Sequence, residues 1–415
     1  MNIRTQCESA RAAARRWARA TTAEKNGALE LIAQALRVEA AAVAETNRRD
    51  LEAGAAAGLT EALLDRLRLD AARVLELASA VEKIRTLPDP VGSRGATRRS
   101  EAGLLIARQR VPLGVIAMIY EARPGVTVDA AALCLKSGNA VVLRGGKEAR
   151  HTNEHLGRIL QRAISEVGLA ADAVQIIAPG ERDEIRELVS LTGLLDLVIP
   201  RGGTGLIRFV TEHARVPVIQ HYMGVCHLFL DRGCDAEMAL ALTLNGKVSR
   251  PGVCNALECL LVDAVDAERL LPPLGAALLD AGVELRACER SHALLPGAHR
   301  AEESDFGAEF LAKILAVRVV DGLEGALEHI ARFGSGHTEA ICTDSHHRAQ
   351  RFLREVDASC VLVNASTRFN DGGQLGLGAE IGISTSKLHA YGPMGLESLT
   401  SEKWVVLGEG QIRTS

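Results

Sequence analysis

The first ninety residues place apolar and Ala side chains at the spacing of an α-helix. Thr21-Thr22-Ala23-Glu24 has the form of a helix-capping sequence, and Thr60 is a second N-cap candidate. A Leu-Pro-Asp-Pro sequence at 87–90 ends the pattern, since a residue before proline is disfavoured in a helix. The pattern predicts helices over 10–20, 28–42, 62–69 and 71–86. The N-terminal block is therefore expected to be entirely helical.

From residue 102 onward, short apolar runs alternate with helical segments. Strands are predicted at 115–119, 140–143, 174–177, 195–199 and 216–220. Helices are predicted between them at 129–136, 153–167 and 184–191, with a last one ending at His213. This alternation is typical of a doubly wound parallel sheet, the Rossmann-like arrangement.

A second α/β set follows. Its predicted strands are 227–230, 256–262, 283–286, 314–319, 339–343 and 360–364, and its predicted helices are 236–244, 267–281, 322–333 and 346–356. The Gly-rich piece at 366–401 is too long for an ordinary loop, so we expect it to be functional. Strand-like arms at 102–111 and 403–407 lie outside both sets. Because an exposed strand edge promotes association, we expect these arms to pair between subunits.

Composition narrows the class of protein. The chain has 415 residues, 47% of them apolar but only 3% aromatic, so Ala, Leu, Val and Ile must fill a large core. A net charge of -4 argues against a nucleic-acid binder, and no 18-residue apolar run indicates a membrane span. Nine cysteines without CxxC spacing, together with an N-terminus that lacks a signal-type apolar stretch, favour a cytoplasmic enzyme with reduced thiols.

One cysteine stands in a setting typical of a nucleophile. Cys254 is the next-to-last residue of the stretch Lys-Val-Ser-Arg-Pro-Gly-Val-Cys-Asn at 247–255, just after a Pro-Gly turn. Turns hold reactive groups at an accessible edge, and the nearby Arg250 favours the nucleophilic thiolate. The competing interpretation is a buried structural cysteine, the usual fate of an unpaired Cys.

Two glycine-rich junctions, each between a predicted strand and a helix, are candidates for phosphate binding. A helix that begins after such a turn presents unpaired backbone N–H groups and the positive end of its dipole. Neither junction matches the full dinucleotide fingerprint, so a tight turn that needs glycine only for packing remains the alternative. The residues are Arg144, Gly145, Gly146 and Lys147 in the first turn, and Arg201, Gly202, Gly203 and Thr204 in the second.

Other polar groups are weaker candidates. The His151–His155 segment fits a zinc-peptidase pattern but lacks a third ligand at suitable spacing, so no metal site is predicted. His221, Tyr222 and His227 include side chains able to act as general bases, although structural histidines are the commoner case. Residues of the Gly-rich piece either bind a carboxylate or phosphate, or are simply solvated: Arg368, Asp371, Lys387 and His389.

Taken together, these segments resemble the γ-glutamyl phosphate reductases of the aldehyde dehydrogenase superfamily. The resemblance covers nearly the whole chain, and several of its strings are long and specific. It is carried by Tyr120–Pro124, Lys136–Lys147, Ile199–Gly203, Arg250–Asn255, Val363–Phe369 and Gly376–Glu380.

The resemblance implies an aldehyde-dehydrogenase-like fold of two doubly wound Rossmann-like domains with β-strand oligomerisation arms. It implies an NADPH-binding domain over 1–225 with an arm near 100–112, and a catalytic domain over 226–364. A Gly-rich segment over 365–401 would return to the active-site cleft, and 402–415 would form the C-terminal oligomerisation strand. A homo-oligomer, dimer or tetramer, is implied, and functional coupling to glutamate 5-kinase is left open.

The resemblance also implies the reaction. NADPH would reduce L-glutamyl 5-phosphate to L-glutamate 5-semialdehyde through a thioester on Cys254, in the second step of proline biosynthesis. The two basic glycine turns would bind the cofactor. The residues that would bind substrate are Arg250, Asn255, Glu121, Arg123, Asn364, Arg368 and Lys387.

Three departures from the aldehyde dehydrogenase pattern are visible. Gln220–Gly224 stands where hydrolytic members carry a water-activating glutamate, and Glu121–Pro124 stands where they carry an oxyanion-binding asparagine. Tyr391 stands where arginine is expected. The missing glutamate favours a reductase over a first rival, an aldehyde dehydrogenase that is non-acylating or CoA-linked and acts on another substrate. Cys254 itself argues against a second rival, a catalytically silent scaffold.

Overall fold

The structure is a computed structural model that describes residues 2–413. The chain divides into two compact units. Unit 1 holds the chain up to Gln220, Leu377–Gly382 and the chain from Met394 onward, while unit 2 holds His221–Gly376 and Ile383–Pro393. The predicted segment 365–401 is thus divided between the units. The functions expected of this segment and of the other domains are not tested by this division and stay predictions. The last two residues of the 402–415 segment lie outside the described residues.

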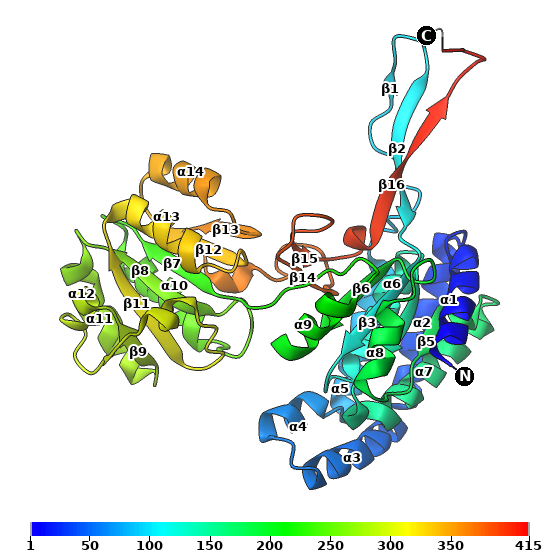
Figure 1. Cartoon of the computed structure of the whole chain (residues 1–415), viewed down its shortest axis with the longest axis horizontal. Helices are drawn as coiled ribbons and strands as arrows, with labels where there is room; N and C mark the ends of the chain where they lie inside the picture. Colours follow the sequence, from blue (N-terminus) through cyan, green and yellow to red (C-terminus); the bar gives the residue numbers. More distant parts are fainter. Residues whose placement is uncertain (1, 414–415) are drawn as a thin grey trace. The chain divides into compact units, whose positions relative to one another are not determined.

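Unit 1 begins with the expected helical block (Figure 1). Thr21 caps the second helix: its side chain accepts a hydrogen bond from Glu24 N, and the Glu24 carboxylate accepts one from Thr21 N in return. The prediction of an all-helical N-terminus is confirmed. The helices are α1 (Ile3–Trp17), α2 (Thr22–Val38), α3 (Ala40–Ala56), α4 (Glu61–Leu67) and α5 (Ala71–Thr86).

A four-stranded parallel sheet of order β5-β4-β3-β6 forms the centre of unit 1. Every residue of β3 is buried, as expected for a strand covered on both faces. The strands are β3 (Val115–Tyr120), β4 (Ala140–Arg144), β5 (Val174–Ile176) and β6 (Leu197–Arg201). The helices that connect and follow them are α6 (Gly125–Lys136), α7 (Arg150–Glu166), α8 (Arg182–Val189) and α9 (Thr204–His213), with the short turns η1 (Lys147–Ala149) and η2 (Ala171–Ala173).

The predicted strand at 216–220 is wrong. Only an isolated bridge joins Val218 to Val198 of β6, through hydrogen bonds from Val198 N to Pro217 O and from Ile219 N to Val198 O. Pro217 has no N–H to continue a ladder, so the apolar run cannot extend the sheet.

Unit 2 is built on a seven-stranded parallel sheet of order β10-β9-β11-β8-β7-β12-β13. Leu, Val, Ile and Ala side chains fill the core on both faces of this sheet. The strands are β7 (Cys226–Leu230), β8 (Leu257–Asp263), β9 (Glu284–Ala287), β10 (His299–Arg300), β11 (Ile314–Val320), β12 (Thr338–Cys342) and β13 (Cys360–Val363). The helices are α10 (Ala236–Val248), α11 (Ala267–Asp280), α12 (Glu289–His292), α13 (Gly322–Phe333) and α14 (His346–Glu355), with η3 (Glu303–Gly307) and η4 (Thr367–Phe369). Except for the short β10, α12, η3 and η4, these elements were predicted.

The two predicted arms pair with each other. In unit 1, β2 (Leu105–Pro112) lies antiparallel to β16 (Thr400–Leu407), and the two-residue β1 (Arg98–Arg99) adds to the far edge of β2. Figure 1 shows this three-stranded ribbon projecting from the body of unit 1. We expected pairing between subunits, but the pairing seen joins two arms of one chain, which leaves the outer edge of β16 open. A two-stranded sheet of β14 (Gly382–Ser384) and β15 (Gly392–Met394), and the turn η5 (Glu397–Leu399), precede β16.

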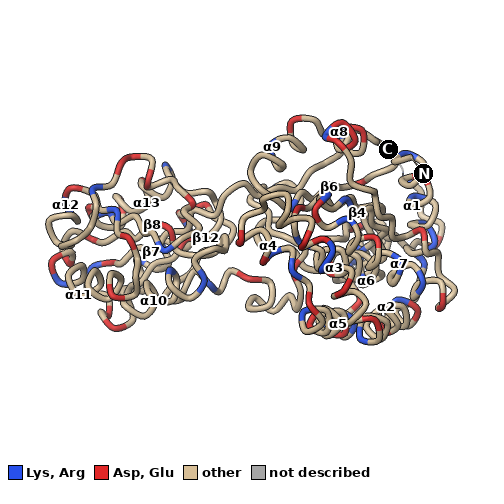
Figure 2. The backbone as a smooth tube through the Cα atoms, turned by 90° about the horizontal axis from the view of Figure 1, so that it is seen from below, with Lys and Arg blue, Asp and Glu red and all other residues tan. Residues whose placement is uncertain are grey.

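Charged residues of both signs are interspersed along the chain (Figure 2). None of the nine cysteines, all of which lie in the described part, forms a disulfide. Within residues 2–413, no helix has both the length and the apolar character needed to cross a membrane.

Candidate active site

Both basic glycine turns lie at the carboxyl edge of the unit 1 sheet. The first follows β4 and the second follows β6, and β3 lies between these two strands. The carboxyl edge of an open parallel sheet is where dinucleotides bind in doubly wound folds. The geometry therefore brings together the two turns that the sequence singled out.

The first turn is explained largely by packing. A Cβ on Gly145 would lie 2.1 Å from Asn153 Nδ2, and one on Gly146 would lie 2.0 Å from Glu148 Oε1. The Arg144 side chain donates to Gly180 O at 2.8 Å, yet its buried Nε has no hydrogen-bond partner among the described residues. Burial lowers the pKa of Arg144, opposed by nearby carboxylates. An orphaned donor of this kind fits a ribose hydroxyl or a phosphate. Lys147 is exposed beside it.

The second turn is exposed at Gly202, Gly203 and Thr204. A Cβ on Gly203 would meet only Glu121 Oε2, at 3.9 Å, whereas one on Gly202 would lie 2.4 Å from that oxygen and 2.8 Å from Leu206 Cδ2. Packing therefore explains Gly202 but not Gly203. The Glu121 carboxylate accepts a hydrogen bond from Gly203 N at 2.9 Å. A carboxylate thus already occupies the N-terminus of α9, and its presence shows that this helix end accepts an anion. Arg201, half-buried, donates to Ile381 O at 3.1 Å.

Cys254 lies in unit 2, in the turn between α10 and β8. Ala256 N donates to Val253 O at 3.0 Å and closes the turn just before β8 starts. Gly224 and His337 stand just before β7 and β12, and the sheet order places β8, β7 and β12 side by side. The nucleophile candidate is half-buried at the amino ends of three adjacent strands. The sequence did not predict that edge.

The backbone of Cys254 is held very closely. A Cβ on Gly224 would lie 2.0 Å from the Cys254 carbonyl oxygen, so only glycine fits there. The fully buried Cys226 donates its S–H to the same oxygen at 3.2 Å, and burial raises the pKa of this thiol well above its ordinary value. Cys226 is therefore a neutral donor that fixes the Cys254 turn, and does not compete with Cys254 as a nucleophile.

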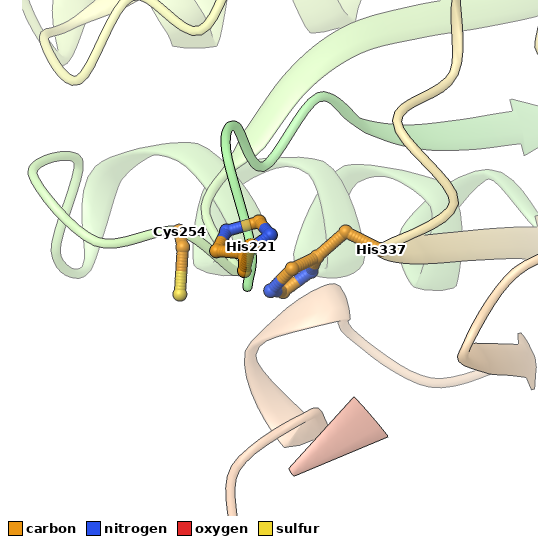
Figure 3. Close-up of side chains that lie close together, drawn as sticks. All are labelled: His221, Cys254 and His337. Carbon is orange, nitrogen blue, oxygen red and sulfur yellow. The ribbon is translucent and has the colours of Figure 1, made fainter. Parts of the chain in front are cut away.

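Two imidazoles accompany the sulfur. A nitrogen of His221, a nitrogen of His337 and the Cys254 sulfur all lie within 4.8 Å of one another. Figure 3 shows the His221 ring between the other two side chains. The two rings have centroids 4.7 Å apart, and His337 Nδ1 lies 2.6 Å from Thr338 Oγ1. Burial, together with the neighbouring His221, lowers the pKa of His337 to about 3, so His337 is neutral.

Arg368 interacts electrostatically with both Arg250 and Cys254. Burial lowers the pKa of Arg368, and the charge of Arg250 lowers it further. Cys254 is among the groups that oppose this shift. Both cations and the sulfur therefore lie in one electrostatic neighbourhood. Arg250 is exposed and Arg368 half-buried. Asn255 fixes the loop that carries Arg368, because its side-chain amide donates to Asn370 O at 2.9 Å. Of the predicted substrate residues, Arg250, Arg368 and Asn255 are thus brought together with Cys254.

The other predicted substrate residues have different surroundings. Both polar atoms of the Asn364 side chain bond to the Thr343 backbone at 2.9 Å, which is a structural task. Lys387 pairs with Asp357 and lies 5.6 Å from the Tyr391 ring centroid, so that tyrosine contacts the lysine where an arginine was expected. Glu121, as described, accepts a hydrogen bond from Gly203 N of the second glycine turn, and Arg123 is exposed two residues after it. Substrate binding by these four residues stays a prediction.

Sequence reasoning missed two carboxylates of unit 2. Glu309 Oε1 accepts from Gly224 N at 2.9 Å, and burial raises the pKa of Glu309. Glu258 pairs with Lys247, both side chains being fully buried, and burial raises the pKa of Glu258 to about 7. Lys247 belonged to the stretch that the sequence singled out, but its partner stands inside an apolar run, so no local pattern indicates the pair.

Metal-donor side chains meet at two places that spacing did not indicate. One is the set of Cys254, His221 and His337, and the other is the buried set of His227, Cys259 and His329. In the second, His227 Nδ1 lies 2.8 Å from Glu339, so its environment is that of a structural core histidine. The His151–His155 pair is engaged elsewhere: His151 bonds to Asp50 and His155 to Glu39.

Comparisons with known proteins agree on one family. The aldehyde dehydrogenase family model matches residues 1–284. A γ-glutamyl phosphate reductase of Sorangium cellulosum is 60% identical over 99% of this chain and 97% of its own length, and one of Geobacter metallireducens is 52% identical over 99% and 98%.

Solved structures give the same result. The crystal structure of γ-glutamyl phosphate reductase from Thermotoga maritima matches with a TM-score of 0.98 and 43% identity over the full length of both chains. An acetylating aldehyde dehydrogenase from Geobacillus thermoglucosidasius is 19% identical with a TM-score of 0.68, covering 100% of this chain and 98% of its own, and so shares the fold. The predicted fold class is confirmed. The chain belongs to the aldehyde dehydrogenase family and, within it, to the γ-glutamyl phosphate reductases.

Proposed function

We propose that this protein reduces L-glutamyl 5-phosphate to L-glutamate 5-semialdehyde and phosphate with NADPH, through a thioester on Cys254. This is the second step of proline biosynthesis from glutamate, and we expect it in the cytoplasm. The observation that carries the proposal is the half-buried Cys254 in the electrostatic neighbourhood of Arg250 and Arg368, in a chain 60% identical to a γ-glutamyl phosphate reductase. An acyl phosphate carries the anion that two arginines bind well.

The cysteine carries out the first chemical step. The thiolate attacks the carbonyl carbon, the bond from that carbon to the phosphate oxygen breaks, and a thioester forms. Arg250 and Arg368 stabilise the thiolate and then the departing phosphate, since both groups are anionic. Neutral Cys226 and the close approach of Gly224 hold the Cys254 backbone in place, so the sulfur need not be repositioned at each turnover.

NADPH, when bound, supplies the hydride that converts the thioester to the aldehyde. Its phosphates fit the exposed turn at Gly202, Gly203 and Thr204, where the helix end already holds a carboxylate. Arg144 fits the adenosine ribose or its 2′-phosphate through its orphaned Nε–H. We therefore expect Arg144→Met to raise KM for NADPH by about tenfold, the loss of one charged hydrogen bond, and to change KM for NADH much less. Equal effects on both cofactors would contradict recognition of the 2′-phosphate.

The decisive experiment is the reverse reaction. Oxidation of glutamate 5-semialdehyde with NADP⁺ should require inorganic phosphate, because phosphate must release the acyl group from the sulfur. Turnover at the same rate without phosphate would indicate hydrolysis of the thioester and contradict the proposal. Hydrolysis is a realistic alternative outcome, because the carboxylate of Glu309 lies near the Cys254 turn. Cys254→Ala should abolish turnover, whereas Cys360→Ala, at another half-buried cysteine of unit 2, should not.

We also propose that the ribbon of β1, β2 and β16 forms the oligomerisation arm of a dimer or tetramer. The outer edge of β16 has no strand partner within the described chain, and Trp404, Val406 and Leu407 on it are 58%, 51% and 56% exposed. Open edges with apolar side chains tend to be covered by another chain.

A further inference from the structure

We propose that His221 accepts the proton of the Cys254 thiol and passes it to the departing phosphate, while His337 holds the His221 ring as an uncharged partner. The part concerning the phosphate rests on the proposed function, and the part concerning the thiol does not.

His221 and His337 each have a nitrogen within 4.8 Å of the Cys254 sulfur. His221 is the half-buried one of the two, and its ring lies between Cys254 and His337 (Figure 3). An imidazole paired with a cysteine favours the thiolate, because the imidazolium that forms is its counter-ion. Hydrogen bonds between catalytic groups are often long without substrate and tighten only when substrate binds.

The surroundings decide which imidazole carries the proton. His337 is fully buried, its Nδ1 faces Thr338 Oγ1 at 2.6 Å, and its Nε2 has no hydrogen-bond partner within residues 2–413. A second charge there would be desolvated and would face a charged His221, so His337 stays neutral. The less buried His221 is the ring that can bear the charge.

Other charged groups around Cys254 and His221 limit how much the loss of His221 changes the ionisation of the thiol. Arg250 and Arg368 also favour the thiolate, so losing His221 should not return the thiol to its ordinary pKa. When they are ionised, Glu309, which accepts a hydrogen bond from Gly224 N, and Asp371, near Arg368, disfavour the Cys254 thiolate. The buried Cys226 is a neutral S–H donor that adds no charge.

Every proton in the proposed reaction has a donor and an acceptor. The S–H proton moves to the His221 nitrogen, the sulfur bonds to the acyl carbon, and the C–O bond to phosphate breaks with its electron pair on the phosphate oxygen. The imidazolium returns its proton to that phosphate. After hydride from NADPH reduces the thioester, the C–S bond breaks, the aldehyde leaves, and the thiolate takes one proton from solvent. One proton is consumed in each reduction.

The test measures Cys254 alkylation by iodoacetamide against pH, without substrate or cofactor. In His221→Gln the pH of half-maximal alkylation should rise by about one unit, and the rate at pH 7 should fall by about tenfold. His299→Gln, an exposed histidine on the distant edge strand β10, is the matched control and should superimpose on the unmodified protein. His337→Gln should keep the midpoint.

Turnover gives the second readout. We expect kcat to fall by about 10²-fold or more in His221→Ala, and added imidazole to restore part of it, which a purely structural role would not allow. A His221→Gln midpoint and kcat equal to those of the unmodified protein would overturn the proposal, as would a midpoint that moves only in His337→Gln. Either result leaves the phosphate-dependent reaction of the unmodified protein standing, so failure of this inference is distinguishable from failure of the proposed function.

Discussion

Replacing Gly224 by alanine places a methyl group against the backbone of the nucleophile. The new Cβ would lie 2.0 Å from the Cys254 carbonyl oxygen, 2.8 Å from its carbonyl carbon and 3.0 Å from its Cα. All three atoms are backbone, so no flexible side chain can move aside. The substitution therefore acts on the position of Cys254 and adds no charge or polar group to the site.

The displacement follows from these distances. Ordinary contacts of a Cβ begin at 3.4 Å, so the Cys254 carbonyl must retreat by about 1.4 Å, or the start of β7 must move by as much. A misplacement of about 1 Å in a reacting group can cost on the order of 10²-fold in rate. We therefore expect kcat to fall by about 10²-fold, equivalent to about 2.7 kcal/mol in the activation free energy.

The assay is phosphate-dependent semialdehyde oxidation, accompanied by a thermal melt. Gly252→Ala is the matched control, since it lies in the same turn but its Cβ would meet only Leu311 O, at 3.8 Å. We expect Gly252→Ala to keep kcat within about twofold, since nothing must move. If Gly224→Ala folds and retains full kcat, the close approach does not position the sulfur, and the reasoning fails.

Three further changes test other parts of the structure. Lys247→Met leaves Glu258 buried without its counter-charge, so the free energy of unfolding should fall by about 3–5 kcal/mol at pH 8. The loss should be smaller at pH 5.5, because burial raises the pKa of Glu258 to about 7 and the carboxyl is then neutral. Equal losses at the two pH values would refute this. Glu121→Gln removes the carboxylate from the N-terminus of α9, so the Kd for NADP⁺ should fall about twofold to fivefold in a fluorescence titration. The control is Glu212→Gln, at the other end of that helix, which should not tighten binding. Trp404→Lys should reduce the assembly measured by light scattering, and an unchanged mass would argue against the arm.

The elements with strong periodicity were predictable, and those that depend on distant partners were not. The capping sequence at Thr21 and the buried run of β3 express local chemistry that the sequence displays. The segment around Pro217 shows the limit, since its apolar side chains resemble a strand while its backbone cannot complete a ladder.

The candidate site shows the same division. Cys254 and its arginine were recognisable from the turn chemistry. The packing of Gly224 against the Cys254 carbonyl was not, because it depends on the order of β7 and β8 in the sheet. Nor was the meeting of His221 with His337, which are more than a hundred residues apart in the chain. The resemblance to a family predicts that Cys254 is the nucleophile, whereas the groups around it depend on tertiary contacts that no local pattern displays.

The pairing of β2 with β16 has a consequence for synthesis of the chain on the ribosome. Residues 105–112 emerge early, but their partner, residues 400–407, is made almost three hundred residues later. Throughout that interval β2 is bonded on one side to β1 and to residues 92–95, while the edge that β16 later covers has no partner. An unpaired strand edge recruits other chains. A chain truncated before residue 400 would keep this edge exposed permanently. β16 thus closes an edge of β2 that stays open until residues 400–407 have been made.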